Sequence, residues 1–221
     1  MAYSFLLRDS LAWTLIFFAL VILAVFTQLT KQKLTRSLPV LLRALIKAAP
    51  ALFLAGLSLF LQAPLVAVGF LLCGLGDIFL DIPEKKAPLA YEIGAVSFAA
   101  ALIVFSVAFL GQQIDGWPLL PLSLTNVVIA VFVLRWVLPK ISGFREVLEV
   151  SYFSILIIAN VIAAMSSVPI FLGSSLWLMS DLSIGLSSHV SDTPANSLDT
   201  LGLYDVGLYF LAIGFLNLGG V

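Results

Sequence analysis

Two aspartates, Asp77 and Asp181, lie inside long apolar stretches of the chain, each eight residues after a glycine. A carboxyl group within a membrane-spanning stretch costs on the order of 3 kcal/mol to insert, so it is rare and usually functional. Paired carboxyl groups suit general acid–base chemistry, because one can act as the acid and the other as the base. The alternative is a structural role, in which each aspartate neutralises a basic residue on a neighbouring helix.

The composition is that of a membrane protein. Of the 221 residues, 62% are hydrophobic and 10% are charged, whereas soluble domains contain about 25% charged residues. The net charge of −1 gives no reason to expect a nucleic-acid partner. The single cysteine, Cys73, excludes an intrachain disulfide and a cysteine-based metal cluster, and the single histidine, His189, weighs against a histidine-rich metal site. We expect one integral membrane domain over residues 1–221, with no metal or other cofactor.

Eight apolar stretches are long enough to cross a bilayer as helices, which takes about 20 residues. They cover residues 11–29, 39–61, 64–82, 87–110, 118–138, 147–167, 170–190 and 200–219. The sequence therefore predicts an all-α polytopic membrane protein, a bundle of eight transmembrane helices. The two aspartate stretches lie about half the chain apart, which fits either two parallel four-helix repeats or a chance similarity.

Basic residues are concentrated in the odd-numbered loops and beside them, and the second, fourth and sixth loops carry none. The positive-inside rule then places the odd loops in the cytoplasm and both termini outside. We expect an integral multi-pass protein of a bacterial inner membrane. The residues that carry this prediction are Lys31, Lys33, Arg36, Lys85, Lys86, Arg135, Lys140 and Arg145.

With this orientation, Lys47, Asp77 and Asp181 all lie roughly 9–14 Å from the cytoplasmic edge of the membrane, at 1.5 Å of rise per helical residue. Three ionisable groups at one depth predict a single polar pocket that opens inward, in which Asp77 and Asp181 approach within direct or one-water hydrogen-bonding reach. By contrast, Glu92 and Asp205 lie near predicted helix ends, where we expect hydration at the membrane interface.

Two further features predict how the helices pack. Gly69, Cys73 and Gly76 have the spacing of small residues that let helices approach closely. Asn160 lies in the middle of an apolar stretch, so we expect its amide to hydrogen-bond across to another helix.

A family resemblance rests on the two aspartate stretches. Residues 69–80, which include Asp77, and residues 173–181, which include Trp177, Ser180 and Asp181, resemble the YhhN-like lysoplasmalogenase family of multipass membrane proteins. Lys47 is similar to a lysine of that family near the start of the second helix. The resemblance covers essentially the whole chain in length, span count and order of motifs.

Other positions match the family less specifically or differ from it. Tyr152 and Met165 are similar to its sixth helix. In its fourth helix the family has a histidine and then a tyrosine, and this chain has Leu102 and Phe105 there. A family glutamine near the carboxyl end is replaced around Ile213.

The resemblance implies a hydrolase that cleaves the vinyl ether of lysoplasmalogens into a fatty aldehyde and a glycerophospho-alcohol. Asp77 and Asp181 would be catalytic, and Lys47, Trp177 and Ser180 would contact the substrate. The partners would be a lysophospholipid and the surrounding membrane lipids. Vinyl ether hydrolysis starts with a proton delivered to carbon, so one carboxyl must be protonated and the other ionised. Which aspartate is the acid stays open, because a coupled pair titrates as a unit.

Two other classes of function remain open. A proton-coupled transporter of a small amphipathic solute would also use buried acids and a lysine, and a repeat would favour it. A non-catalytic lipid-binding membrane protein is the other, and Leu102 in place of the family's histidine motivates it. The oligomeric state and the headgroup preference stay open as well.

Overall fold

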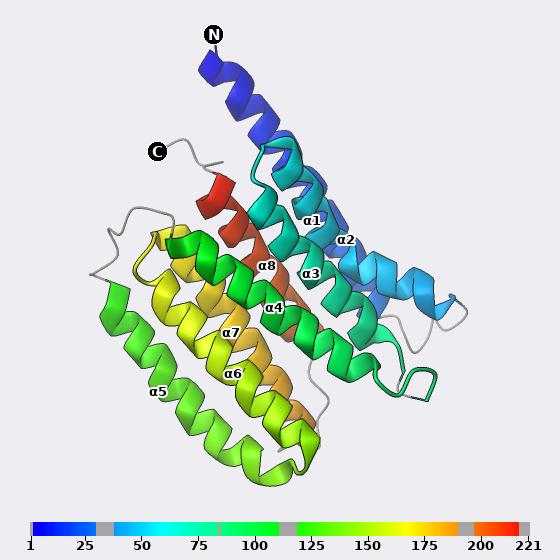
Figure 1. Cartoon of the computed structure of the whole chain (residues 1–221). Helices are drawn as coiled ribbons and strands as arrows, with labels where there is room; N and C mark the ends of the chain where they lie inside the picture. The colour runs from blue at the N-terminus through cyan, green and yellow to red at the C-terminus, as the bar shows by residue number, and fades with distance from the viewer. Residues whose placement is uncertain (1, 30–37, 84, 111–118, 190–196, 217–221) are drawn as a thin grey trace.

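The computed structural model describes residues 2–29, 38–83, 85–110, 119–189 and 197–216, with side chains over 11–29, 38–83, 85–110, 119–187 and 200–216. The described residues form eight α-helices and a short 3-10 turn at Leu138–Lys140 (Figure 1). The helices are α1 Ala2–Leu29, α2 Val40–Phe60, α3 Pro64–Asp81, α4 Ala90–Leu110, α5 Leu120–Val137, α6 Phe144–Ala163, α7 Val168–His189 and α8 Ser197–Leu216.

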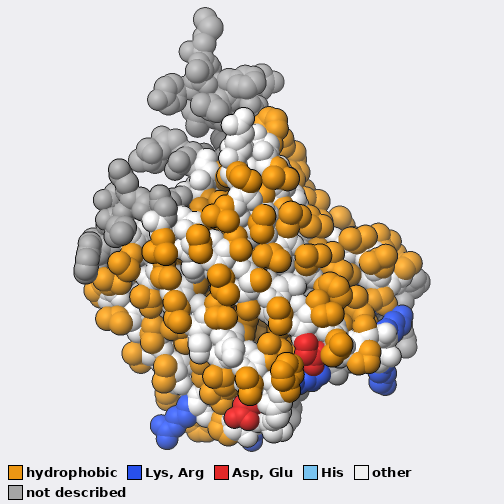
Figure 2. Space-filling model, viewed as in Figure 1, with side chains coloured by type: hydrophobic (Ala, Val, Ile, Leu, Met, Phe, Trp, Pro, Cys, Tyr) orange, Lys and Arg blue, Asp and Glu red, His pale blue; other side chains and the backbone are white. Residues whose placement is uncertain are grey.

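Helices α1 to α7 are each long and apolar enough to cross a membrane, and α8 carries a shorter apolar stretch, Thr200–Leu216. Hydrophobic side chains cover the flank of the bundle that Figure 2 shows, and charged side chains gather at its lower end. Apolar side chains on an outer surface need a lipid environment rather than water. The predicted fold class, an all-α polytopic membrane bundle, is therefore confirmed.

The predicted spans agree with the helices within three residues at each end, except for the first and the sixth. Helix α1 starts at Ala2, well before the predicted residue 11. Helix α6 runs from Phe144 to Ala163 rather than over 147–167. Its start is set by Gly143, whose φ of 73° lies in the left-handed region that favours glycine. As a result, Arg145 belongs to the first turn of α6.

The connection between α2 and α3 is a tight hairpin. Gln62 adopts a positive φ of 59°, and the Ala63 amide donates back to the Ser58 carbonyl at 2.8 Å. Pro64 then opens α3, where its missing N–H is not needed. This short turn holds α2 and α3 antiparallel and in a fixed register.

The two halves of the chain are packed differently. Helices α1 to α4 lie side by side in chain order, whereas α6 packs more closely on α4 than on α7 (Figure 1). Helix α8 returns to the first half and contacts α1 and α2 as well as α7. This difference gives no support to two equivalent four-helix repeats.

Small residues allow the closest helix contacts, as expected for α3. A Cβ atom on Gly69 would lie 2.5 Å from the Phe105 ring, and one on Gly76 would lie 2.6 Å from the Phe98 ring. In the α7–α8 pair the approach involves the backbone, because a Cβ on Gly173 would lie 2.6 Å from the Gly207 carbonyl oxygen. Both aspartate helices are thus fixed tightly against a partner helix.

Candidate functional site

A cavity of about 370 Å³ opens between α3, α4, α6, α7 and α8, with α2 at one side. All five site residues predicted from the sequence line it: Lys47, Asp77, Trp177, Ser180 and Asp181. Lys47, Asp77 and Asp181, which the sequence placed at one depth, thus line the same cavity. The described residues show no direct hydrogen bond between the two aspartates, so the direct form of the expected contact is absent.

Asp77 lies in an ionic environment. Its side chain is buried, and the Lys47 Nζ atom lies 3.3 Å from its Oδ1 atom. The Tyr204 hydroxyl of α8 donates to the Oδ2 atom at 3.1 Å. Three helices therefore meet at this carboxyl group, and an ammonium group balances its charge.

Asp181 has a different set of neighbours. The Tyr152 hydroxyl of α6 donates a short hydrogen bond to its Oδ2 atom. Among the described residues no cation pairs with it, and its side chain is only partly buried because it faces the cavity. The two aspartates thus share a cavity but not an electrostatic environment.

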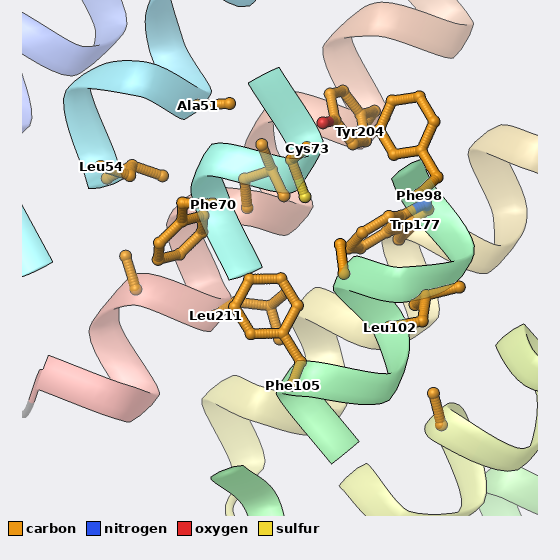
Figure 3. Packing of buried hydrophobic residues seen from close by; sticks show 14 of the residues in the cluster. Ala51, Leu54, Phe70, Cys73, Phe98, Leu102, Phe105, Trp177, Tyr204 and Leu211 are labelled. Atoms are coloured by element: carbon orange, nitrogen blue, oxygen red, sulfur yellow. The ribbon is translucent and has the colours of Figure 1, made fainter. Parts of the chain in front are cut away.

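Aromatic rings form the apolar wall of the cavity beside the carboxyl groups. Phe98, Trp177 and Tyr204 meet edge to face, with ring centroids 5.5 to 5.9 Å apart (Figure 3). Trp177, expected from the resemblance to contact the substrate, lines the cavity although it is almost fully buried. Ser180 also lines the cavity, but its hydroxyl donates to the Thr200 carbonyl at 2.7 Å and so joins α7 to α8.

The family's histidine position falls outside this cavity. Leu102 and Phe105 belong to the apolar core, and neither lines the cavity. Figure 3 places Leu102 below Trp177, one helical turn along α4 from Phe98. Leu102, which we expect at the position of the family's histidine, therefore belongs to the core rather than to the cavity wall.

A second pair of charges lies one turn from Lys47 and Asp77, on the same two helices. The Arg43 Nε atom lies 3.9 Å from the Asp81 Oδ2 atom, and Gln28 of α1 donates to Asp81 Oδ1 at 3.2 Å. Because α2 and α3 run antiparallel, Arg43, four residues before Lys47, faces Asp81, four residues after Asp77. Arg43 and Asp81 do not line the cavity, whereas Lys47 and Asp77 do. The outer pair therefore serves as a structural comparison for the pair at the site.

The structure corrects the expectation for Asp205. Its side chain is 1% exposed, and neither carboxylate oxygen has a hydrogen-bond partner among the described residues. The reason is that α8 starts at Ser197, so Asp205 lies two turns inside the helix rather than at the interface. Glu92 is also less hydrated than expected, because Arg145 Nε lies 3.7 Å from its Oε1 atom.

Sequence reasoning missed a polar cluster at the mouth of the cavity. Tyr91, Arg145 and Glu149 all line the cavity near the first turns of α4 and α6. The Tyr91 hydroxyl donates to Glu149 Oε1 at 2.8 Å, and the Arg145 guanidinium lies 5.0 Å above the Tyr91 ring. Only an accurate start for α6 would have placed Arg145 beside Tyr91.

The Asn160 expectation is confirmed. Its amide nitrogen donates to Ser175 of α7 at 3.1 Å, and its Oδ1 atom accepts from Ser123 and Asn126 of α5. This network joins α5, α6 and α7 away from the cavity. The predicted loop residues Lys31, Lys33 and Arg36 and the side chain of His189 lie outside the described residues.

The fold and the cavity define a multi-pass membrane protein with a polar site built from two carboxyl groups and a lysine inside an apolar bundle. The model of the YhhN family matches residues 42–215, and the chain belongs to this family. The match covers α3 to α8 and all but the first residues of α2. Neither the curated proteins nor the solved structures gave a match.

Proposed function

We propose that this protein is a membrane-embedded hydrolase that cleaves the vinyl ether bond of lysoplasmalogen-type lysophospholipids, using Asp77 and Asp181. The observation that carries the proposal is the unequal pairing of two carboxyl groups that line one cavity. Asp77 faces an ammonium group at 3.3 Å, whereas Asp181 faces a hydroxyl. Acid–base catalysis by two carboxyl groups requires one to be ionised and the other protonated. The different neighbours favour Asp77 as the ionised group and Asp181 as the acid.

The first step would use Asp181 as the general acid. It donates a proton to the outer carbon of the vinyl ether, and the electrons of the double bond form the new C–H bond. The resulting oxocarbenium ion is stabilised by the negative charge of Asp77. Water then adds to the cationic carbon and gives up a proton to Asp77, which yields a hemiacetal.

The second step restores both carboxyl groups. Asp77 returns its proton to the leaving ether oxygen while Asp181 removes the proton from the hemiacetal hydroxyl. The carbon–oxygen bond breaks, and a fatty aldehyde and a glycerophospho-alcohol are released. One water is consumed in the cycle, and the protein ends in its starting state.

Other cavity residues would position these groups. Tyr152 and Tyr204 each donate to one oxygen of their carboxyl group and so fix its orientation. The edges and faces of Phe98 and Trp177 offer an apolar surface for the alkenyl chain beside the reacting bond.

The test is aldehyde release by the purified protein from a 1-alkenyl lysophospholipid, with the saturated 1-alkyl ether lipid as the substrate control. We expect Asp77→Asn and Asp181→Asn to abolish release. Asp81→Asn, which changes the buried pair one turn away, is the matched control and should retain it. Full activity in both site variants would contradict the proposal.

A proton-coupled transporter remains a second candidate, because Asp205 adds a buried carboxyl group whose oxygens have no hydrogen-bond partner among the described residues. Intramembrane acids without a partner are typical of proton relays. Substrate-dependent proton uptake by proteoliposomes, lost in Asp205→Asn but with no aldehyde formed, would favour transport. The motive for a non-catalytic lipid-binding protein is weaker, since Leu102 lies outside the cavity.

We further propose an inner-membrane location with both termini outside. The exposed basic residues Lys85, Lys86, Lys140 and Arg145 lie after the end of α3, after the end of α5 and in the first turn of α6. Basic side chains gather at the lower end of the molecule in Figure 2, and the start of α1 and the end of α8 lie at the opposite end in Figure 1. With the basic end inside, the mouth of the cavity would open toward the cytoplasm. Terminal reporter fusions that are active only in the cytoplasm would contradict this orientation.

A further inference from the structure

The polar cluster at the cavity mouth has the chemistry of a headgroup-binding site. The Arg145 side chain is 44% exposed, contacts Glu92 through Nε, and lies over the Tyr91 ring. Glu149 is 7% exposed and accepts the Tyr91 hydroxyl. The ring and Glu92 thus hold the guanidinium in place, and a guanidinium presents five N–H donors in a planar fork suited to phosphate.

Lys47, which sequence reasoning placed on the substrate, is a poorer phosphate ligand. Its ammonium group lies against the Asp77 carboxylate at 3.3 Å, well inside the bundle. A phosphate there would compete with that carboxylate and would bring a second negative charge next to it. Arg145, at the mouth, can bind an anion without breaking the pair that fixes Asp77.

The charges at the mouth also restrict the ligand. Arg145 is accompanied by two carboxylates: Glu92, which contacts its Nε atom, and Glu149, which lines the cavity one turn further along α6. A phosphate bound to Arg145 would therefore lie near negative charge as well as near the cation. A headgroup that carries a positively charged amine next to its phosphate matches this arrangement, since each of its charges faces an opposite one.

The spacing along α6 fits a ligand that reaches from the mouth to the carboxyl pair. Arg145 and Tyr152, the partner of Asp181, are seven residues apart, which is about 10 Å of helical rise. Both line the same cavity, as does Glu149 between them. A glycerol bridge between the phosphate and the reacting bond is comparable in length to this distance.

We propose that Arg145 and Glu149 form the headgroup subsite of this cavity, with Arg145 binding the phosphate and Glu149, supported by Tyr91, binding an adjacent amine. The inference rests on the proposed function in one respect, namely that the rest of the ligand is a vinyl ether lipid chain. The subsite itself is defined by binding, and it can be tested without hydrolysis.

The kinetic test compares three vinyl ether substrates: one with a phospho-amine head, one with phosphate alone, and a 1-alkenylglycerol with neither. Arg145→Gln should raise KM for the phospho-amine substrate about 10- to 100-fold, the range for hydrogen bonds to charged groups, with kcat nearly unchanged. It should leave the 1-alkenylglycerol unaffected. Glu149→Gln should raise KM only for the phospho-amine substrate.

The control variants carry the same changes outside the cavity. Arg135→Gln alters an exposed arginine of α5, and Glu146→Gln alters an exposed glutamate next to Arg145 that does not line the cavity. Neither should change KM for any substrate. Arg145→Lys keeps the positive charge but loses the planar guanidinium donors, so we expect a KM between those of the wild type and Arg145→Gln. This variant replaces Arg145→Gln in the test if Arg145→Gln does not fold.

A binding measurement separates the subsite from the reaction. The non-cleavable 1-alkyl phospho-amine lipid is titrated into detergent-solubilised protein, with the water-soluble glycerophospho-amine and inorganic phosphate as further probes, and thermal unfolding reports binding. If the wild type binds this lipid and Arg145→Gln weakens binding, the subsite holds even when no aldehyde is ever released. If the wild type releases aldehyde but Arg145→Gln and Arg145→Lys leave KM and binding unchanged, the subsite is wrong and the hydrolase stands.

Discussion

Asp77 and Asp181 occupy matching positions in two apolar helices, yet their surroundings differ in kind. Asp77 of α3 is buried beside the ammonium group of Lys47, which α2 supplies. Asp181 of α7 faces the cavity and receives the hydroxyl of Tyr152 from α6. The aspartate helices are alike in sequence, and the difference comes from the helix that each one meets.

This contrast shows how one residue type can take two roles at one site. A carboxyl group with a fixed cation nearby is suited to remain a carboxylate, whereas one held only by a neutral donor can exchange its proton. The packing of α2 against α3, and of α6 near α7, therefore decides the chemistry more than the aspartate motifs do.

The largest expected effect is on catalysis. Asp181→Asn and Asp77→Asn should each lower aldehyde release by about 10²- to 10⁴-fold, because each removes a proton donor or acceptor. The double variant should lose no more than either single one, since residues that act as a unit are not additive. Steady-state rates at saturating lipid measure this, and additive losses would mean that the two carboxyl groups act independently.

The next largest effect is on stability, and it should separate the two aspartates. Lys47→Met leaves Asp77 buried without its cation, which costs about 3 kcal/mol or more for a buried pair. The double change Lys47→Met with Asp77→Asn should recover most of this loss, whereas adding Asp181→Asn to Lys47→Met should not. Thermal unfolding in detergent is the measurement. Equal recovery of stability by both aspartate changes would contradict the inference that Lys47 pairs with Asp77 and not with Asp181.

Helix approach should differ in the same two regions. In Gly173→Ala the new methyl group meets the Gly207 carbonyl, which cannot move without shifting α8, so we expect a loss of about 2–3 kcal/mol. In Gly69→Ala the methyl group meets the Phe105 side chain rather than a backbone atom, so the loss should be smaller, nearer 1 kcal/mol. Denaturant unfolding of the two variants provides the comparison, and a larger loss for Gly69→Ala would contradict it.

The smallest effect concerns the two tyrosines. Tyr152→Phe removes the hydroxyl that donates to Asp181 and should slow turnover about tenfold, from the loss of roughly 1–1.5 kcal/mol. Tyr204→Phe should have less effect, because Asp77 keeps its contact with Lys47. Turnover of the two variants at saturating lipid is the measurement, and a larger loss for Tyr204→Phe would show that Lys47 does not hold Asp77.

The sequence predicted the membrane helices and the shared depth of Lys47, Asp77 and Asp181, because both follow from apolar run length and helical rise. Trp177 lies one helical turn before Asp181, so its place beside that carboxyl group also follows from helical rise. These features depend on residues close together in the chain, so apolar run length and the rise of an α-helix are enough to predict them.

The rest depended on contacts between helices that are distant in the chain. The pairing of Tyr204 with Asp77 needs α8 to return against the first half, which no local pattern indicates. The burial of Asp205 depended on where α8 starts. Helix α2 also continues through Pro50, although the ring removes the N–H donor for the Ile46 carbonyl, so this proline breaks no helix.

The matched charges of α2 and α3 have a consequence for the way this protein enters the membrane. Alone, α2 would bring Arg43 and Lys47 into the bilayer, and α3 would bring Asp77 and Asp81. A charge at the helix centre costs about 2.5–3.5 kcal/mol, and the cost falls toward the helix ends where Arg43 and Asp81 lie. Joined by the tight turn at Gln62, the two helices can partition into lipid as one hairpin whose opposite charges already face each other. We therefore expect the translocation machinery to release α2 only once α3 has been synthesised.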